Sequence, residues 1–224
     1  MAKQQTTQFP GAFSLLRPSA QAMILNIWTF LALFTIALVY SIISNFSENQ
    51  TGSPVMMLLS LGSLVLNIMV APAYVITQLQ SAKEKEISFG DAVREGLPYV
   101  FRIFFLQLLT LVLVVIGLVL VIVPGLFAVQ RLLLAPFYLV DKDLGIIEAM
   151  KASATDSKKY SGAVWGLIGA SVAFALPVFT IILTPVSIVL LLAYICAPAI
   201  RYYQIQIVRE KKKTHTPAKQ NPTF

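Results

Sequence analysis

Long uncharged apolar runs alternate with short charged stretches along the whole chain. The runs cover residues 22–43, 54–79, 103–140 and 162–200, and Arg131 is the one charge within them. A helix crosses a membrane with about 20 apolar residues, so the third and fourth runs are each long enough for two spans. The pattern therefore predicts an all-α membrane protein with six transmembrane helices, arranged as three helical hairpins.

Prolines divide the two longest runs. We expect the turns at Pro124-Gly125 and at Pro185, because proline and glycine favour a turn over continued helix. The two resulting hairpins agree in length up to Pro136 and Pro198. We also expect Pro177 to kink the fifth span. The predicted spans are 22–43, 54–79, 103–123, 126–140, 162–184 and 186–203.

Three Ala-Pro pairs lie near the ends of the apolar runs, at Ala71-Pro72, Ala135-Pro136 and Ala197-Pro198. This regular spacing suggests that one hairpin is used three times. Because proline removes a backbone donor, we expect Pro72, Pro136 and Pro198 to kink the returning helices. The kinks would serve as a shared packing device; alternatively, the three helices would meet around a vestibule open to the cytoplasm.

Two charged stretches, residues 80–102 and 141–161, separate the hairpins. Each predicts a short amphipathic helix lying at the membrane surface. We expect Asp141 and Asp143, at the end of a helix, to be solvated charges. The apolar positions at helical spacing are Phe89, Ala92 and Val93 in the first stretch and Ile146, Ile147 and Met150 in the second.

The composition supports a single membrane domain. Of 224 residues, 57% are hydrophobic and 12% are charged, whereas soluble domains carry about 25% charged residues. We place the domain at 1–208 and expect residues 209–224 to form a disordered basic tail. Cys196 is the only cysteine, so an intramolecular disulfide is excluded, and the only histidine, His215, lies in the tail.

The distribution of positive charge predicts the orientation. Of 17 Lys and Arg residues, all but Arg131 lie at the two ends of the chain or in the two charged stretches. The positive-inside rule then places both termini and both stretches in the cytoplasm. The net charge of +7 suits contact with anionic lipids at that face. We expect no nucleic-acid binding, because acidic residues interrupt the basic stretches.

Arg131 and Asn67 occupy matching positions, each five residues before the proline of an Ala-Pro pair. A mid-membrane arginine costs about 2.5–3.5 kcal/mol on insertion scales, so it needs a partner. Candidates within the apolar runs are Asn67, Gln107, Gln130 and the backbone carbonyls freed at Pro136, and an anionic lipid or solute is another. Arg131 would thus form an interhelical clasp, extend toward the nearer surface, or contact a ligand.

No motif for catalysis, phosphate binding or metal binding occurs in the sequence. We therefore expect no catalytic residue, cofactor or metal, and no enzymatic activity. Glycines such as Gly117, Gly162, Gly166 and Gly169 predict close helix packing, with Gly162-x-x-x-Gly166 as a weak indication of an interhelical face.

Pro124-Gly125-Leu126, Arg131, Ala135-Pro136, the acid at 141, Glu148-Ala149-Met150 and Ser153 resemble the signature of a broad group of bacterial six-helix membrane proteins. This group includes the membrane domain attached to some glycerophosphodiester phosphodiesterases. The resemblance is best over 88–170 and implies a bacterial inner-membrane protein. The given chain departs from it in having no adjoining phosphodiesterase domain, so we expect no hydrolase activity.

Together these features predict a non-enzymatic protein of the bacterial inner membrane that acts through contacts with lipids or with a membrane protein partner. The alternative is a small transporter or channel for an anionic solute, with Arg131 and Asn67 lining its path. A polar cavity that reaches Arg131 would favour transport, whereas a packed centre would disfavour it.

Overall fold

A computed structural model describes residues 9–49, 54–120, 122–176 and 184–214. These residues form helices and connecting segments, and no strand occurs among them. The predicted all-α class is therefore confirmed. The helices, in chain order, are α1 (Leu16–Leu25), α2 (Ile27–Asn49), α3 (Pro54–Ala82), α4 (Phe89–Gly96), α5 (Val100–Leu120), α6 (Ile122–Leu132), α7 (Ala135–Asp141), α8 (Ile146–Lys159), α9 (Ser161–Ala175), α10 (Thr184–Ala193) and α11 (Ala197–Thr214).

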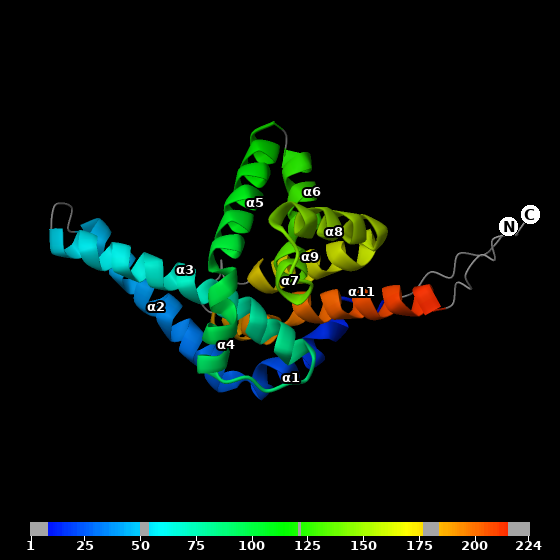
Figure 1. The fold of residues 1–224 in the computed structure, drawn as a ribbon, viewed down its shortest axis with the longest axis horizontal. Coiled ribbons are helices and arrows are strands. Elements are labelled where there is room, and N and C mark those ends of the chain that lie inside the picture. The colour runs from blue at the N-terminus through cyan, green and yellow to red at the C-terminus, as the bar shows by residue number, and fades with distance from the viewer. Residues whose placement is uncertain (1–8, 50–53, 121, 177–183, 215–224) are drawn as a thin grey trace, which may run out of the picture.

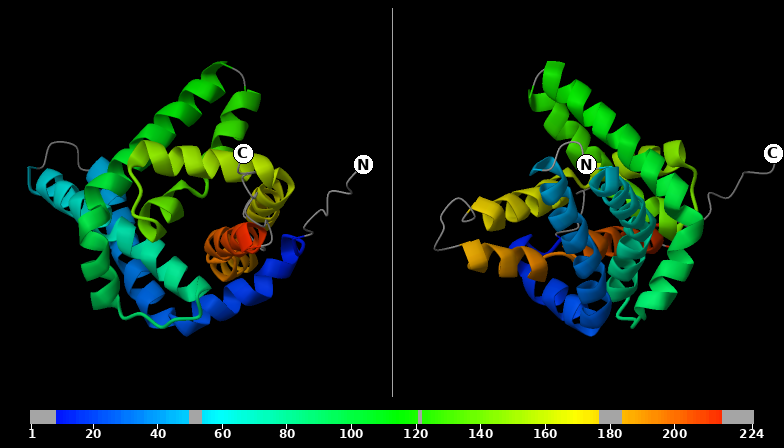
Figure 2. Two further views of the ribbon diagram at one scale, coloured as in Figure 1. Left: turned by 45° about the vertical axis from the view of Figure 1, so that its right-hand side comes forward. Right: turned by 90° about the vertical axis from the view of Figure 1, so that its left-hand side faces the viewer.

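Two long hairpins project from a common base. Figure 1 shows α2 and α3 extending to one side while α5 and α6 extend upward, so the far ends of the two hairpins diverge. The base contains α1, α4, α7, α8 and the first turns of α11. Figure 2 (left) looks nearly along α11, which contacts α1, α3 and α9. The buried core lies at this base, where side chains from α3, α5, α7, α8 and α11 pack together.

Four stretches are long and apolar enough to cross a membrane by length and composition. They are Ile27–Phe46, Pro54–Ala82, Phe89–Val119 and Pro185–Lys211. The chain is thus a multi-pass membrane protein. Six separate spans are not evident among the described residues, because α6 and α10 have only 11 and 10 residues.

The helix boundaries differ from the predicted spans at three places. The first span is split at Asn26, and α2 begins only at Ile27. The second hairpin turns before Pro124 rather than at it, because α6 begins at Ile122 and tolerates proline in its first turn. Likewise, Pro185 is the second residue of α10. Pro177 lies outside the described residues.

Asn26 interrupts the first span because its side chain bonds to the loop after α3. Its Nδ2 donates to Ser81 Oγ and to the Lys85 carbonyl, each at 2.9 Å, and its Oδ1 accepts from the Ile87 amide at 2.7 Å. The side chain is almost fully buried. A buried amide with three partners is well satisfied, so Asn26 fixes the 83–88 loop against the start of α2.

The C-terminal residues also differ from prediction. Residues 209–214 continue α11 instead of starting a disordered tail. Glu, Lys and Arg are good helix formers, and Arg209 is held by an ion pair to Asp156 on α8. Residues 215–224 lie outside the described part of the chain.

The two predicted amphipathic helices form, as α4 and α8, but both are packed into the base. Ala92 of α4 and Ala149 of α8 are fully buried. An added methyl at Gly96 would lie 2.9 Å from the Ala73 nitrogen, so α4 rests directly on α3 beside Pro72. The buried side of α8 consists mainly of Ala149, Met150, Ser153, Asp156 and Ser157, whereas Ile147 is exposed.

The three Ala-Pro pairs occupy two kinds of position. Pro72 lies inside the continuous helix α3. Pro136 and Pro198 instead lie in the first turns of α7 and α11, after breaks that separate these helices from α6 and α10. A missing amide is harmless at the start of a helix, because the first turn has no intrahelical acceptor. Two of the expected kinks are therefore helix breaks.

Candidate functional site

Asp141, the last residue of α7, joins the three helices that carry the Ala-Pro pairs. Lys83, directly after α3, places its Nζ 2.6 Å from Asp141 Oδ1. Tyr202 on α11 donates a hydrogen bond to Oδ2 at 2.8 Å. Lys142 lies 3.5 Å from the same oxygen. The Asp141 side chain is only 11% exposed, so one largely buried carboxylate connects α3, α7 and α11.

A second carboxylate, Asp156 of α8, lies one turn of α11 away. Tyr138 donates its hydroxyl proton to Asp156 Oδ2 and accepts a hydrogen bond from Gln206 Nε2 at 2.7 Å. Arg209 Nη1 lies 3.4 Å from Asp156 Oδ2. The Asp156 side chain is 6% exposed, whereas Arg209 is 47% exposed. The negative charge is therefore buried and its cation reaches toward the surface.

The rings of Tyr138 and Tyr202 connect the two carboxylates. Their centroids are 4.9 Å apart and the ring planes are perpendicular, which is a favourable edge-to-face contact. We refer to these groups as the tyrosine–carboxylate cluster. Its members are Lys83, Tyr138, Asp141, Asp156, Tyr202, Gln206 and Arg209.

The environment of Asp141 favours its charged form. Burial on its own would raise the pKa of this carboxyl group. Hydrogen bonds from Lys83 and Tyr202, together with the charges of Lys83 and Lys142, outweigh burial and hold its pKa below the usual value. Asp141 is therefore ionised at neutral pH and forms a true ion pair with Lys83.

The carboxylates of this cluster are already paired. Each carboxylate already has both a cation and a tyrosine hydroxyl as partners. Among the described residues, no group of three His, Cys, Asp or Glu side chains is arranged to hold a metal ion. The cluster holds the ends of the hairpins together and has no free carboxylate that would serve as a general base.

The sequence interpretation of this region was partly wrong. Asp141 was expected to be solvated, but it is buried because α3 and α11 pack on both sides of it. Asp143 does lie at the surface, with 67% of its side chain exposed and an ion pair of 2.6 Å to Arg102. One feature of the sequence could have indicated the cluster. Tyr138 lies two residues after Pro136 and three residues before the acid at 141.

The predicted Asn67–Arg131 clasp is not formed. No hydrogen bond joins these two residues among those that the structure describes. Arg131, in the last turn of α6, is exposed, and Asn67 is half-buried on α3. Gln107 is exposed on α5. Within the described part of the chain, no hydrogen bond joins any two of the residues Asn67, Gln107, Gln130 and Arg131.

Gln130 instead helps to hold α6 against α8. Its Nε2 donates to the Ser157 carbonyl at 2.9 Å, in the last turn of α8. In return, Ser153 on α8 donates its hydroxyl proton to the Arg131 carbonyl at 2.6 Å, in the last turn of α6. Carbonyls in a last turn lack an intrahelical donor. The two side chains therefore satisfy the ends of each other's helices.

Two shallow hollows of about 400 Å³ lie on the base. Asp91, Arg94 and Glu95 of α4 line the first, and the second lies between the start of α2 and the loop before α4. Neither is lined by Arg131 or Asn67.

The chain has a relative among curated proteins. The chain is similar to a UPF0259 membrane protein. This relative, from Sodalis glossinidius (strain morsitans), is 31% identical over 138 residues, which cover 59% of the present chain and 55% of the relative. The matched stretch thus spans about half the length of the curated relative.

No protein-family description matches the chain. No solved structure matches it either. The relative agrees with the apolar helices in indicating a membrane protein.

Proposed function

We propose that this chain is a six-span protein of the bacterial inner membrane whose base faces the cytoplasm and binds anionic lipid headgroups or a membrane protein partner, without catalysing a reaction. The observation that carries the proposal is the separation of exposed side chains. Those on α2, α3 and α5 are mainly large and apolar, whereas charged side chains gather on α4, α8, the loops between them and the end of α11.

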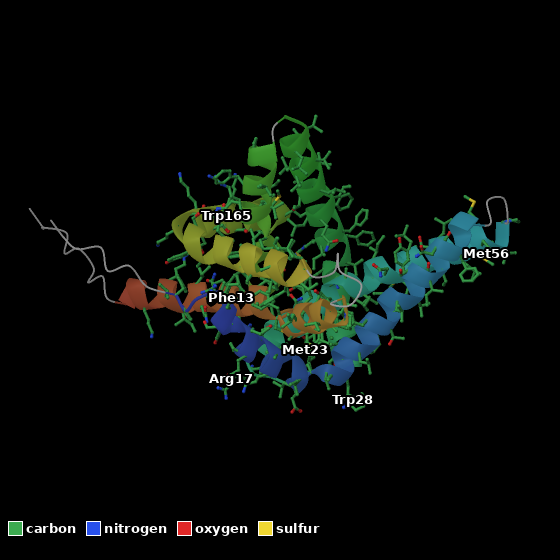
Figure 3. The ribbon with its side chains drawn as sticks, turned by 180° about the vertical axis from the view of Figure 1, so that it is seen from behind. Phe13, Arg17, Met23, Trp28, Met56 and Trp165 are labelled. Atoms are coloured by element: carbon green, nitrogen blue, oxygen red, sulfur yellow. The ribbon has the colours of Figure 1, made fainter. Side chains whose placement is uncertain are left out.

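The ends of the first hairpin illustrate this separation. Figure 3 labels Met56 near the far end of α3 and Trp28 at the near end of α2, with Arg17 beyond it on α1. Trp28 is 79% exposed. Tryptophan favours the boundary between hydrocarbon and water. The level of Trp28 therefore suits the cytoplasmic interface, with α1 in the headgroup region and the hairpin in lipid.

Six spans are compatible with the short helices if each broken pair crosses as a unit. Residues 122–140, which comprise α6 and all of α7 except Asp141, are 19 in number, enough for one crossing at a rise of about 1.5 Å per residue. The third hairpin would cross as α9 with the residues after it and return as α10 and α11. The similarity to membrane domains of phosphodiesterases remains a prediction from the sequence signature.

Labelling of engineered cysteines tests the topology. Glu48→Cys places a thiol near the end of the first hairpin, and Glu95→Cys and Lys151→Cys each place one on the base. The native Cys196 is fully buried. A membrane-impermeant maleimide should label Glu48→Cys in intact spheroplasts and the other two variants only after lysis. Labelling of Lys151→Cys in sealed cells would contradict the orientation.

Lipid selectivity tests the proposed contact. We expect purified protein to retain phosphatidylglycerol in preference to phosphatidylcholine, as measured by native mass spectrometry. Each Lys near an anionic surface contributes about 1 kcal/mol, so Lys151→Gln with Lys158→Gln should reduce the preference about 30-fold. Thr155→Ala, an exposed change on the same helix, is the control and should leave it unchanged.

Transport of an anionic solute is the alternative function, but its support is weaker. It requires a polar path that includes Arg131 and Asn67, but among the described residues no hydrogen bond joins this pair, and neither of the two hollows on the base is lined by them. Anion flux into liposomes would decide between the two functions. Flux that falls when Arg131 is replaced by alanine would favour transport over the proposed function.

A further inference from the structure

Arg201 of α11 is a buried cation with an incomplete set of partners. It is 1% exposed, and among the described residues no carboxylate pairs with it. Its Nη2 donates to the Pro10 carbonyl and its Nη1 to Gln204 Oε1, both at 3.1 Å, while its Nε has no hydrogen-bond partner. A buried guanidinium normally has an anionic partner. The missing anion is therefore a feature of this site that needs an explanation.

Phe9 covers this guanidinium. Arg201 Cζ lies 5.4 Å from the centroid of the Phe9 ring, and the Phe9 ring makes an edge contact of 5.2 Å with Tyr160. The residues before α1 thus supply a carbonyl and an aromatic face where an anion would otherwise neutralise Arg201. Neither contact brings a negative charge to the guanidinium, whereas an anion would add one and would bond to two of its N–H groups, so an anion would compete with them.

Tyr160 adds a second unsatisfied group on the other side of Phe9. Its ring is buried and its hydroxyl has no hydrogen-bond partner in the described part of the chain. The Nζ of the exposed Lys159 lies 5.4 Å from the centroid of the same ring. Phe9 thus contacts both the guanidinium and the phenol ring, and the ammonium group of Lys159 contacts the same phenol ring. All three donate hydrogen bonds and two are positive.

We propose that Arg201, Tyr160 and Lys159 form a binding site for a phosphate group, and that Phe9 and Pro10 cover this site until the ligand displaces them. Phosphate has the charge and the several acceptor oxygens that a guanidinium fork and a phenol require. The group belongs either to a lipid headgroup or to a free phosphate. This inference depends on the proposed function in one respect only, which is that the ligand arrives from the cytoplasmic side.

Opening the cover should raise the affinity for phosphate. In purified full-length protein in detergent, we would titrate inorganic phosphate and, separately, short-chain phosphatidylglycerol by calorimetry. Phe9→Ala removes the aromatic cover and should tighten binding about 3- to 30-fold. Phe13→Ala is the matched control, because Phe13, which Figure 3 labels, belongs to the same segment but packs on Phe174.

Removing the cation should abolish the increase in phosphate affinity that Phe9→Ala produces. Phe9→Ala combined with Arg201→Gln should bind at least about 10-fold more weakly than Phe9→Ala alone. Arg94→Gln, an equal change in charge at an exposed position of α4, should leave the binding of inorganic phosphate to Phe9→Ala unchanged. Should Arg201→Gln fail to fold, Arg201→Lys keeps the charge and loses the fork, and an intermediate affinity is expected.

A dye at Gly11→Cys reports displacement of the segment. Gly11 is exposed and a Cβ there has open space around it. Phosphate should change the emission of this dye in the wild-type background but not with Arg201→Gln. If the protein binds phosphatidylglycerol but not inorganic phosphate, the ligand is a lipid headgroup. If it binds both equally, the ligand is a free phosphate. Absence of binding to Phe9→Ala would overturn the site while leaving the labelled topology intact.

Discussion

Lys83 Nζ and Asp141 Oδ1 lie 2.6 Å apart, although 58 positions separate the two residues in the sequence. One belongs to the end of the first hairpin and the other to the end of the second. Tyr202, on α11 after the third hairpin, bonds to the same carboxylate. A single ion pair with one added hydroxyl therefore fixes how the returning helices meet, while the far ends of the hairpins stay apart (Figure 1).

Replacing Asp141 by asparagine should destabilise the base. The change keeps the shape of the side chain but removes the ion pair and leaves Lys83 without its partner. Hydrogen bonds to charged groups contribute about 1.5–3 kcal/mol, so we expect a loss of that order in the free energy of unfolding in mixed micelles. Asp143→Asn is the control and should cost less than about 1 kcal/mol, because its ion pair to Arg102 is exposed.

The contribution of Asp141 should also depend on pH. Its pKa in the folded protein is lower than in the unfolded chain, since Lys83 and Tyr202 favour the carboxylate over the acid. The stability that it contributes is therefore present above the unfolded pKa of about 3.9 and lost as the pH falls through the folded pKa. The difference in stability between the wild type and Asp141→Asn should shrink below about pH 4. A difference that grows on acidification would contradict the ion pair.

Ser153→Ala should loosen the contact between α6 and α8. The Ser153 hydroxyl is buried and satisfies the Arg131 carbonyl at 2.6 Å. Leaving a buried carbonyl without its donor costs about 1–3 kcal/mol. Thr155→Ala is the matched control, because Thr155 is exposed and bonds only to its own helix. Equal melting temperatures for the two variants would show that the Ser153 bond is not stabilising.

The sequence predicted the helices well because lipid imposes a simple rule on them. Uncharged runs had to become helices, and α3 begins at Pro54 as expected. The charged stretches formed α4 and α8 at the expected places, with Ser88 capping α4 by accepting from the Asp91 amide. The prediction of which helix faces are buried was wrong. On α8, small and polar residues are buried while Ile147 is exposed, which hydropathy alone would reverse.

The site could not be predicted because it depends on which helix ends meet. Arg201 stands at the end of an apolar run, where a position near the headgroups is the natural interpretation. Only the folded chain shows that Phe9, 192 positions earlier, lies over it. Matching Asn67 to Arg131 by their distance from a proline failed for a related reason. The helix is continuous at Pro72 but broken before Pro136, so equal spacing does not give equal surroundings.

Asn67 and Arg131 should contribute independently to stability. They form no hydrogen bond with one another, so the effects of Asn67→Ala and Arg131→Ala should add to within about 0.5 kcal/mol in a double-mutant cycle. The pair Lys83→Ala and Asp141→Ala is the positive control, because these residues are in direct contact. A coupling energy between Asn67 and Arg131 as large as that of the control pair would show that the two side chains do form a clasp.

Gly117→Ala should separate the two helices of the second hairpin. An added methyl at Gly117 would lie 2.8 Å from the Gly125 Cα, which is closer than carbon atoms tolerate. The atom that it meets belongs to the backbone, so α5 and α6 have to move apart, and overpacking of this kind costs about 1–3 kcal/mol. Gly169→Ala on α9 is the control, because nothing lies within 4 Å of its Cβ. Unfolding in mixed micelles should show a loss for Gly117→Ala alone; equal stabilities would mean that the close approach of α5 and α6 is absent in lipid.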